Sequence, residues 1–223
     1  MKKIISLFST LPFIFIFLIV SCAPPPTTSP DMRPSELTII LPTAWKDENY
    51  QGERFKKVFI IAALQDPVFK RLCEDEFVRQ LAAHGTDSVA SYSVYLTHFI
   101  SDKESVTAKI KQAQADALLI ARLMKTDRAA QDVLQEKFVL PPWYYDWYEY
   151  YSSGFGLSQS PSYRDQNFRI ITETTFYDTK EQKLLWFARS EILEVPCVRC
   201  QDITAPIKFI VERMSSDRLI ESQ

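Results

Sequence analysis

Two cysteines near the carboxyl end, Cys197 and Cys200, have the spacing of a metal-binding or redox-active pair. A structural zinc site needs four ligands, and the other candidates, Cys73, His84 and His98, supply no second pair at ligand spacing. A thioredoxin-like redox role needs the pair at the start of a helix that follows a first strand, whereas this pair closes the predicted domain. The spacing therefore favours a structural disulfide between Cys197 and Cys200, and no metal is expected.

The remaining residues that could carry catalysis form no recognisable constellation. His84 and His98 fall outside the signatures of serine and cysteine hydrolases, and the 4 glycines form no phosphate-binding loop. The acidic run at residues 74–76 fits a solvated helix face, and Cys73 is expected to be a small buried residue. We therefore expect a protein that is not an enzyme and that uses no cofactor.

A different cysteine chemistry is indicated at Cys22. The chain opens with a positive Lys2–Lys3, continues with an apolar run over residues 11–20 and reaches Ser21 directly before this cysteine. The layout resembles a bacterial lipoprotein signal, in which the peptide is cut before the cysteine, the sulfur takes a diacylglycerol and the new amino group is acylated. Residues 1–21 are then a signal peptide. The alternative is a transmembrane anchor, which needs about 20 apolar residues, and this run is shorter and interrupted.

Lipidation at Cys22 would tie the protein to a membrane of the cell envelope, because several acyl chains together, palmitate among them, hold a protein stably on a bilayer. In lipoproteins of enterobacterial type, an aspartate after the cysteine favours the inner membrane. Ala23 stands at this position, so the resemblance implies a lipid-anchored protein of the outer membrane that faces the periplasm. This oxidising compartment supports the Cys197–Cys200 disulfide.

The charge of the mature chain argues against nucleic acid as a partner. Removal of the signal peptide leaves 24 basic against 28 acidic residues, whereas nucleic-acid-binding domains normally carry a basic surplus on one face. With 46% hydrophobic residues, residues 55–216 can bury one core as a single globular domain. Residues 217–223 are predicted to be a polar, frayed tail.

Residues 22–54 have the composition of a tether. Five prolines between positions 24 and 34 alternate with serine and threonine, which favours an extended, semi-rigid spacer. An apolar run at residues 36–45 interrupts the spacer. We interpret this run as a short strand or a packed arm, and a partner-binding peptide is the alternative.

Apolar runs and capping residues predict alternating strands and helices. Asp66 can cap the exposed amides of a helix, and Pro67 suits its first turn. Ser101 and Glu104 predict a capping box at the start of the next helix. The final helix is predicted near Thr204.

The predicted strands lie at residues 58–64, 88–96 and 116–124, followed by an antiparallel hairpin at 168–177 and 184–195. The fold class is therefore α/β (α+β), with one mixed sheet in the order β-α-β-α-β, then the hairpin and a C-terminal helix, and with the helices packed on the sheet.

The segment 140–151, within an insertion at 138–165, is dense in aromatic residues. It could be a loop or hairpin folded over the sheet edge, a surface for a protein partner, or a contact for sugar or membrane. It is too short for the two long hairpins of a pore-forming subunit. The partner-binding candidates are Trp143, Tyr144, Tyr145, Trp147, Tyr148, Tyr150 and Tyr151.

The element order and two stretches, ADALLIARL at residues 115–123 and TETTFYDTKEQKLLWFARSE at 172–191, resemble an uncharacterised group of bacterial lipoproteins. The fold of this group is similar to that of the amino-terminal domain of the Tol translocation protein, the lipoprotein activators of penicillin-binding proteins and the curli-secretion lipoprotein. The resemblance covers residues 57–214, and its motifs specify the fold rather than a chemistry.

Three functions follow from these patterns. The favoured hypothesis is a tethered, non-catalytic module that binds an envelope protein and is anchored in the membrane by its lipid. The second is a small-ligand, glycan or peptidoglycan binder. The third is a structural subunit of an envelope secretion assembly, which would form homo-oligomers.

Overall fold

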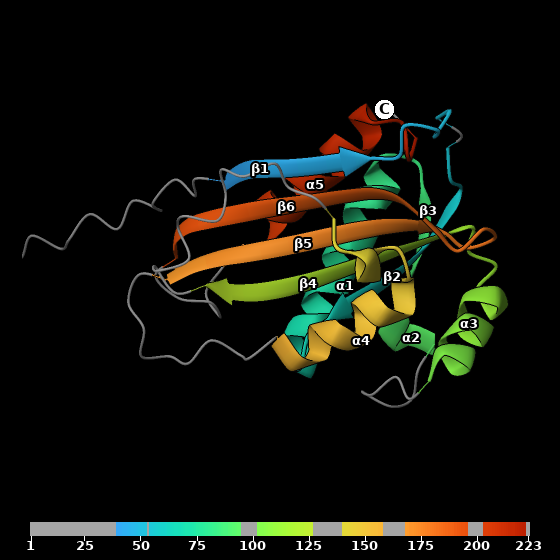
Figure 1. The fold of residues 1–223 in the computed structure, drawn as a ribbon, viewed down its shortest axis with the longest axis horizontal. Coiled ribbons are helices and arrows are strands. Elements are labelled where there is room, and N and C mark those ends of the chain that lie inside the picture. Colours follow the sequence, from blue (N-terminus) through green and yellow to red (C-terminus); the bar gives the residue numbers. More distant parts are fainter. Residues whose placement is uncertain are drawn as a thin grey trace, which may run out of the picture. The chain divides into compact units, whose positions relative to one another are not determined.

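The computed structural model describes residues 39–52, 54–94, 102–126, 140–157, 168–195 and 203–221. In these residues the chain forms a six-stranded sheet in the order β1-β6-β5-β4-β2-β3 (Figure 1). The strands are β1 (Ile39–Lys46), β2 (Lys57–Ala63), β3 (Asp87–Ala90), β4 (Ala117–Thr126), β5 (Phe168–Asp178) and β6 (Lys183–Val195). The helices are α1 (Pro67–Ala83), α2 (Ser91–Val94), α3 (Lys103–Gln112), α4 (Trp147–Leu157) and α5 (Thr204–Ser216), with a 3-10 turn, η2, at Pro142–Tyr144.

The sheet is mixed, as the sequence predicts. β2 pairs in parallel with β3 and β4, and β4, β5, β6 and β1 follow one another antiparallel. The predicted hairpin is the β5–β6 pair. The apolar run at residues 36–45 contributes β1, which confirms the strand interpretation and adds an edge strand before the predicted start of the domain at residue 55.

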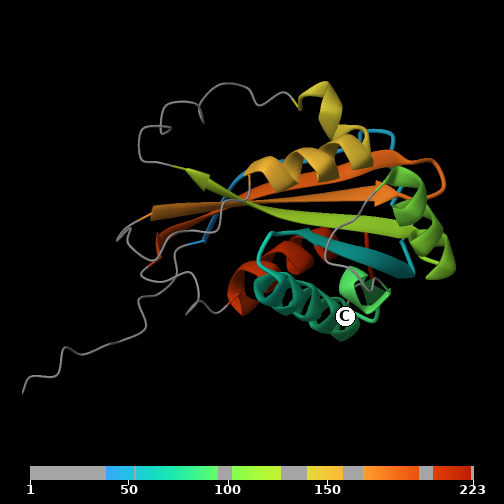
Figure 2. The same cartoon turned by 90° about the horizontal axis from the view of Figure 1, so that it is seen from below.

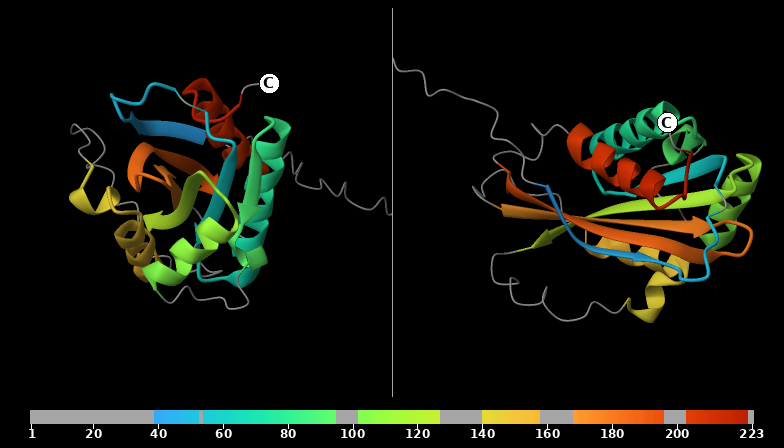
Figure 3. Two further views of the ribbon diagram at one scale, coloured as in Figure 1. Left: turned by 90° about the vertical axis from the view of Figure 1, so that its right-hand side faces the viewer. Right: turned by 90° about the horizontal axis from the view of Figure 1, so that it is seen from above.

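Helices cover both faces of the sheet (Figures 2 and 3). α1 and α5 pack on the face that carries Ile60 and Trp186, and α3 and α4 pack on the face that carries Phe59 and Phe187. Since successive side chains of a strand point to opposite faces, a strand covered on both sides must be apolar throughout. The continuous apolar run of β2 is therefore explained by its position between β4 and β3, with helices packed on both faces.

The ends of the helices agree only in part with the predicted caps. α1 begins as expected, because the Asp66 carboxylate accepts hydrogen bonds from the amides of Val68 at 2.9 Å and Phe69 at 3.1 Å. α3 is capped by Asp102, whose carboxylate accepts from the amide of Ser105 at 2.6 Å, so the predicted Ser101 cap is wrong. The charged carboxylate is also the stronger acceptor at the positive end of a helix.

The predicted second strand is too long. β3 ends at Ala90, and the chain turns into the short helix α2. The cause lies in the buried carboxylate of Glu74, which accepts hydrogen bonds from the Ser91 hydroxyl at 2.7 Å and from the Tyr92 amide at 3.1 Å. These bonds hold the chain against α1 and draw it away from the sheet after Ala90.

The predicted frayed tail is wrong as far as residue 221. Leu219 and Ile220 are fully buried, and the Leu219 carbonyl accepts a hydrogen bond from the Phe55 amide at 3.0 Å. The sequence pattern hides this pair because polar residues surround it. In the part of the chain that the structure describes, no helix has both the length and the apolar character to cross a bilayer.

Candidate functional site

The aromatic segment forms η2 and α4, so the predicted loop or hairpin at the sheet edge is wrong. Asp146 caps α4, since its carboxylate accepts hydrogen bonds from the amides of Tyr148 at 2.8 Å and Glu149 at 3.1 Å. Trp147, Tyr150 and Tyr151 follow at helical spacing and share one buried face. In the sequence, the capping residue Asp146 and the helical spacing of these aromatic residues are the two signals that indicate a helix.

Most of the predicted partner-binding residues lie in the core. Tyr144, Trp147, Tyr150 and Tyr151 are each at most 4% exposed, and Trp143 and Tyr148 are partly buried against them. Tyr145 alone of the seven is well exposed, at 47%, and its ring meets that of Trp45 edge-on. The segment therefore offers a partner little more than Tyr145.

Beneath the aromatic helix lies a buried row of charges. The strand register places Arg122 on β4, Glu173 on β5 and Arg189 on β6 directly opposite one another. Each arginine lies 2.5 Å from a different oxygen of the Glu173 carboxylate, and the Tyr144 hydroxyl donates a hydrogen bond to it at 3.0 Å. One fully buried carboxylate thus joins three strands and the η2 turn.

The aromatic rings complete the surroundings of Arg122. Its guanidinium carbon lies 4.1 Å from the ring centre of Tyr150 and 4.8 Å from that of Trp143, close enough for cation–π attraction. Burial, together with the nearby Glu173 charge, raises the pKa of Tyr144 to about 12 and that of Tyr150 well above its usual value. Both phenols stay protonated at neutral pH, and the largely buried cluster links α4 and η2 to the sheet.

The acidic run at residues 74–76 is only partly solvated, so that prediction is wrong for two of its three members. Glu74 is fully buried and contacts the ammonium of Lys70. Glu76 is 9% exposed and pairs with Arg79, which leaves Asp75 exposed. The Lys70 ammonium donates to the hydroxyl of Ser91 at 2.8 Å. This Ser-Lys pair offers no accessible nucleophile, because Ser91 is fully buried and the lysine is held by Glu74.

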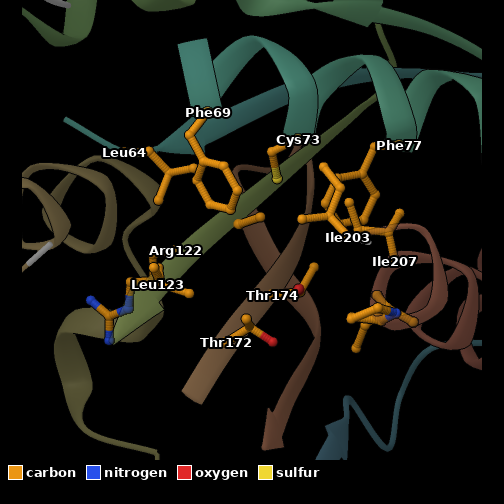
Figure 4. Close-up of a pocket in the computed structure, with 13 residues that line it drawn as sticks. Leu64, Phe69, Cys73, Phe77, Arg122, Leu123, Thr172, Thr174, Ile203 and Ile207 are labelled. Atoms are coloured by element: carbon orange, nitrogen blue, oxygen red, sulfur yellow. The ribbon is translucent and has the colours of Figure 1, made fainter. Parts of the chain in front are cut away.

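A small apolar cavity lies between α1 and α5, above β4 and β5 (Figure 4). Its volume is about 60 Å³. The Cys73 sulfur points into it from α1, with Phe69 and Phe77 on the same helix, and Thr172 and Thr174 lie below it on β5 (Figure 4). The lining residues are Leu64, Phe69, Cys73, Phe77, Ala121, Arg122, Leu123, Thr172, Thr174, Ile203, Pro206, Ile207 and Ile210.

The Cys73 thiol has a low reactivity. Burial, and then the negative charge of Glu74, raise its pKa to about 12, so almost none of it is the reactive thiolate at neutral pH. This agrees with the predicted role of a small apolar residue.

The same two helices carry most of the exposed apolar side chains. Val68 and Leu72 on α1 are 66% and 54% exposed, and Phe209 on α5 is 36% exposed. Among the described residues, only Tyr145 is a further large apolar side chain of this kind. We call the exposed Val68, Leu72 and Phe209, together with the cavity between their two helices, the α1/α5 surface. The sequence does not reveal this surface, because Leu72 follows Phe69 and precedes Cys73 at a spacing typical of the buried face of a helix, and the structure shows instead that Leu72 is exposed.

The other predicted site residues give no second candidate. Cys22, Cys197, Cys200 and His98 lie outside the described residues, so the lipid site and the disulfide stay predictions. His84 ends α1 as its C-cap. Among the residues that the structure describes, no three His, Cys, Asp or Glu side chains come together as a possible metal site.

No protein-family model and no curated protein matches the chain. Solved structures with a similar arrangement include the PelC dodecamer from Paraburkholderia phytofirmans in two crystal forms. The C2 form, of a PelC variant, has a TM-score of 0.41 at 8% identity and covers 84% of this chain and 99% of that chain. The P6 form has a TM-score of 0.42 at 9% identity, with coverages of 81% and 99%. Lipoprotein GNA1162 from Neisseria meningitidis has a TM-score of 0.35 at 10% identity, with coverages of 72% and 96%. The likeness is one of general arrangement.

Proposed function

We propose that the protein is a lipid-anchored lipoprotein of the cell envelope that binds another envelope protein through the α1/α5 surface and catalyses no reaction. The observation that carries the proposal is that three of the four large apolar side chains exposed among the described residues, Val68, Leu72 and Phe209, lie on the two helices that border an apolar cavity. The sequence features at Cys22 and in the proline-rich tether support the anchor.

The energetics favour a covered state of this surface. Each large apolar side chain that moves from water into an interface contributes about 1.5–3 kcal/mol when it is fully buried. Charged neighbours lie on the same helices, with Arg71 and Asp75 on α1 and Lys208 on α5 all exposed. An apolar centre with a charged rim is the usual composition of a protein-binding patch.

The size of the cavity favours a protein partner over a lipid. A volume of about 60 Å³ equals roughly four to six water positions at about 10–15 Å³ each. One apolar side chain of a partner fits this space, whereas a whole acyl chain does not. The cavity would thus receive one anchor side chain of the partner, and the partner would also cover Val68 and Leu72 on α1.

Site-specific photo-crosslinking in cells tests the surface. A photoreactive side chain at Leu72 should give a discrete crosslinked product, while the same group at Glu149, exposed on the other face of the sheet, should give none. A product with twice the mass of the chain would identify a second copy as the partner and favour the assembly subunit. Equal crosslinking from both positions, or none from Leu72, would refute the proposed surface.

The anchor is tested at Cys22. In the Cys22→Ser variant the protein should move from the membrane to the soluble fraction, because the acyl chains supply the membrane affinity. The mature amino-terminal peptide of the unmodified protein should carry the mass of the acyl groups, and density fractionation should place it with the outer membrane. Retention of the serine variant in the membrane would support the transmembrane alternative.

A further inference from the structure

A second cavity lies at the turn end of the β5–β6 hairpin, on the face of the sheet opposite to the α1/α5 surface. It is bounded by α3, the start of β4, the first residue of α4 and the β5–β6 turn. Its volume is about 380 Å³, within the range of small-molecule sites, which are about 300–1,000 Å³. A ligand bound here would add to the proposed function and would not depend on it.

The walls are fixed by internal hydrogen bonds. The Thr179 hydroxyl donates to the Ala115 carbonyl at 2.8 Å, and the Thr179 amide donates to the Asp116 carbonyl at 3.1 Å. The Tyr177 hydroxyl donates to the Tyr144 carbonyl at 2.7 Å. These bonds join the β5–β6 turn to the α3–β4 connection and β5 to η2, so the cavity is preorganised.

Two glutamines with positive φ lie at this cavity. Gln182 lines it with a φ of +54°, and Gln114, beside the lining residue Ala115, has a φ of +55°. Glycine or asparagine would adopt this left-handed conformation at a lower cost. Glutamine therefore places a long amide side chain where the turn itself would favour a small residue.

The polar groups at the cavity suit a ligand with both a negative charge and hydroxyl groups. Lys111 on α3 and Lys180 on the turn are exposed, and neither ammonium has an ion-pair partner within the described part of the chain. One oxygen of Asp178 accepts hydrogen bonds from the amides of Lys180 at 2.6 Å and Glu181 at 3.0 Å. Its second oxygen can accept from a ligand hydroxyl, and Trp147 supplies an apolar wall.

We propose that this cavity binds an acidic saccharide unit. Its carboxylate would pair with Lys111 and Lys180, and its hydroxyls would bond to Asp178 and the Gln182 amide. Its apolar ring face would meet the apolar lining, to which Trp147 contributes the small part of its side chain that the cavity exposes. The Asp178 carboxylate disfavours a simple inorganic anion, which it repels, but it accepts hydrogen bonds from a polyol.

Calorimetric titration of the full-length protein tests this site, with glucuronate, glucose and inorganic phosphate as probes. Glucuronate should bind at least tenfold more tightly than either glucose or phosphate. Lys111→Gln and Lys180→Gln should each weaken glucuronate binding at least fivefold. Lys56→Gln, a matched change at an exposed lysine outside the cavity, should leave the binding unchanged.

Three outcomes would overturn the proposal. Absence of glucuronate binding at tens of millimolar would remove the site. Phosphate binding as tight as that of glucuronate would mean a simple anion site. Equal losses in all three lysine variants would mean a diffuse charge effect. Circular dichroism of each variant confirms that it is folded, and the crosslinking at Leu72 reports on the other face independently.

Discussion

At the scale of single residues, charged side chains lie in the core of the protein as well as on its surface. Glu173 is fully buried and accepts from two arginines and a tyrosine. Removing one member of a buried ionic group leaves the others without compensation, which costs more than the intact group contributes. Among the polar groups beneath α4, the row across β4, β5 and β6 is therefore the one whose substitution should lower the stability of the fold most.

Glu173→Gln should lower the free energy of unfolding by about 3–5 kcal/mol, because the buried guanidinium of Arg122 and the partly buried one of Arg189 would lose their shared carboxylate. Urea unfolding followed by circular dichroism measures this change. Glu181→Gln, on the exposed β5–β6 turn, is the matched control and should change the stability by less than about 0.5 kcal/mol. A loss below about 1 kcal/mol for Glu173→Gln would show that the row contributes little.

Cys73 should react with thiol reagents very slowly in the folded protein. Its pKa of about 12 stands against a usual value of 9.0, so the thiolate fraction near neutral pH falls about a thousandfold. The rate can be followed by absorbance in a variant whose other three cysteines are serine. Urea should restore fast labelling. A native rate within tenfold of the unfolded rate would show that the thiol is open to solvent.

At the scale of elements, the β-strands and the first helix follow from the sequence, and the aromatic helix does not. The continuous apolar run of β2 and the Asp66-Pro67 start of α1 are local signals that packing only reinforces. The sequence favours no helix at α4 because tyrosine and tryptophan have modest helix propensity, although Asp146 is a suitable helix cap. The end of β3 depends on Glu74, which lies 17 residues away from Ser91 in the sequence. No local sequence pattern predicts such a contact. The sequence does not reveal the α1/α5 surface either, because the helical spacing of Leu72 alone does not show whether its side chain faces the sheet or the solvent.

α4 is linked to α3 by the ion pair between Asp146 and Lys103, at 2.7 Å. Burial opposes ionisation of Asp146, but the hydrogen bonds from Lys103 and from two helix amides outweigh it and lower the pKa of this carboxyl. A lowered aspartate pKa contributes stability above the ordinary value of about 3.9, and this contribution is lost as the pH falls through the lowered pKa of the folded state.

Asp146→Asn keeps a capping side chain and removes the charge. It should lower the free energy of unfolding at pH 7 by only about 0.5–1 kcal/mol, since the pair is partly exposed to water. The difference between the two proteins should narrow as the pH falls from 6 to 3. Urea unfolding at a series of pH values measures it, and a gap that widens toward pH 3 would contradict the lowered pKa.

At the scale of the whole described domain, the two faces of the sheet differ in what they leave exposed. α3 and α4 cover one face, where α4 buries most of its aromatic side chains, and the opposite face is covered by α1 and α5, which leave Val68, Leu72 and Phe209 exposed. A tether in the proline-rich residues 24–34, ahead of β1, would let such a face meet a partner near the membrane. The candidate binding surface therefore moves from the aromatic segment to the α1/α5 surface.

The most direct test of this claim compares two charged variants of the full-length protein. The size of the detergent-solubilised complex on a native gel is measured for Val68→Lys/Leu72→Lys and for Tyr145→Lys, with circular dichroism to confirm that both are folded. We predict that the double variant migrates without its partner, while Tyr145→Lys, on the aromatic segment, keeps the complex intact. An intact complex in the double variant, or its loss in Tyr145→Lys alone, would contradict the assignment of the binding surface to α1 and α5.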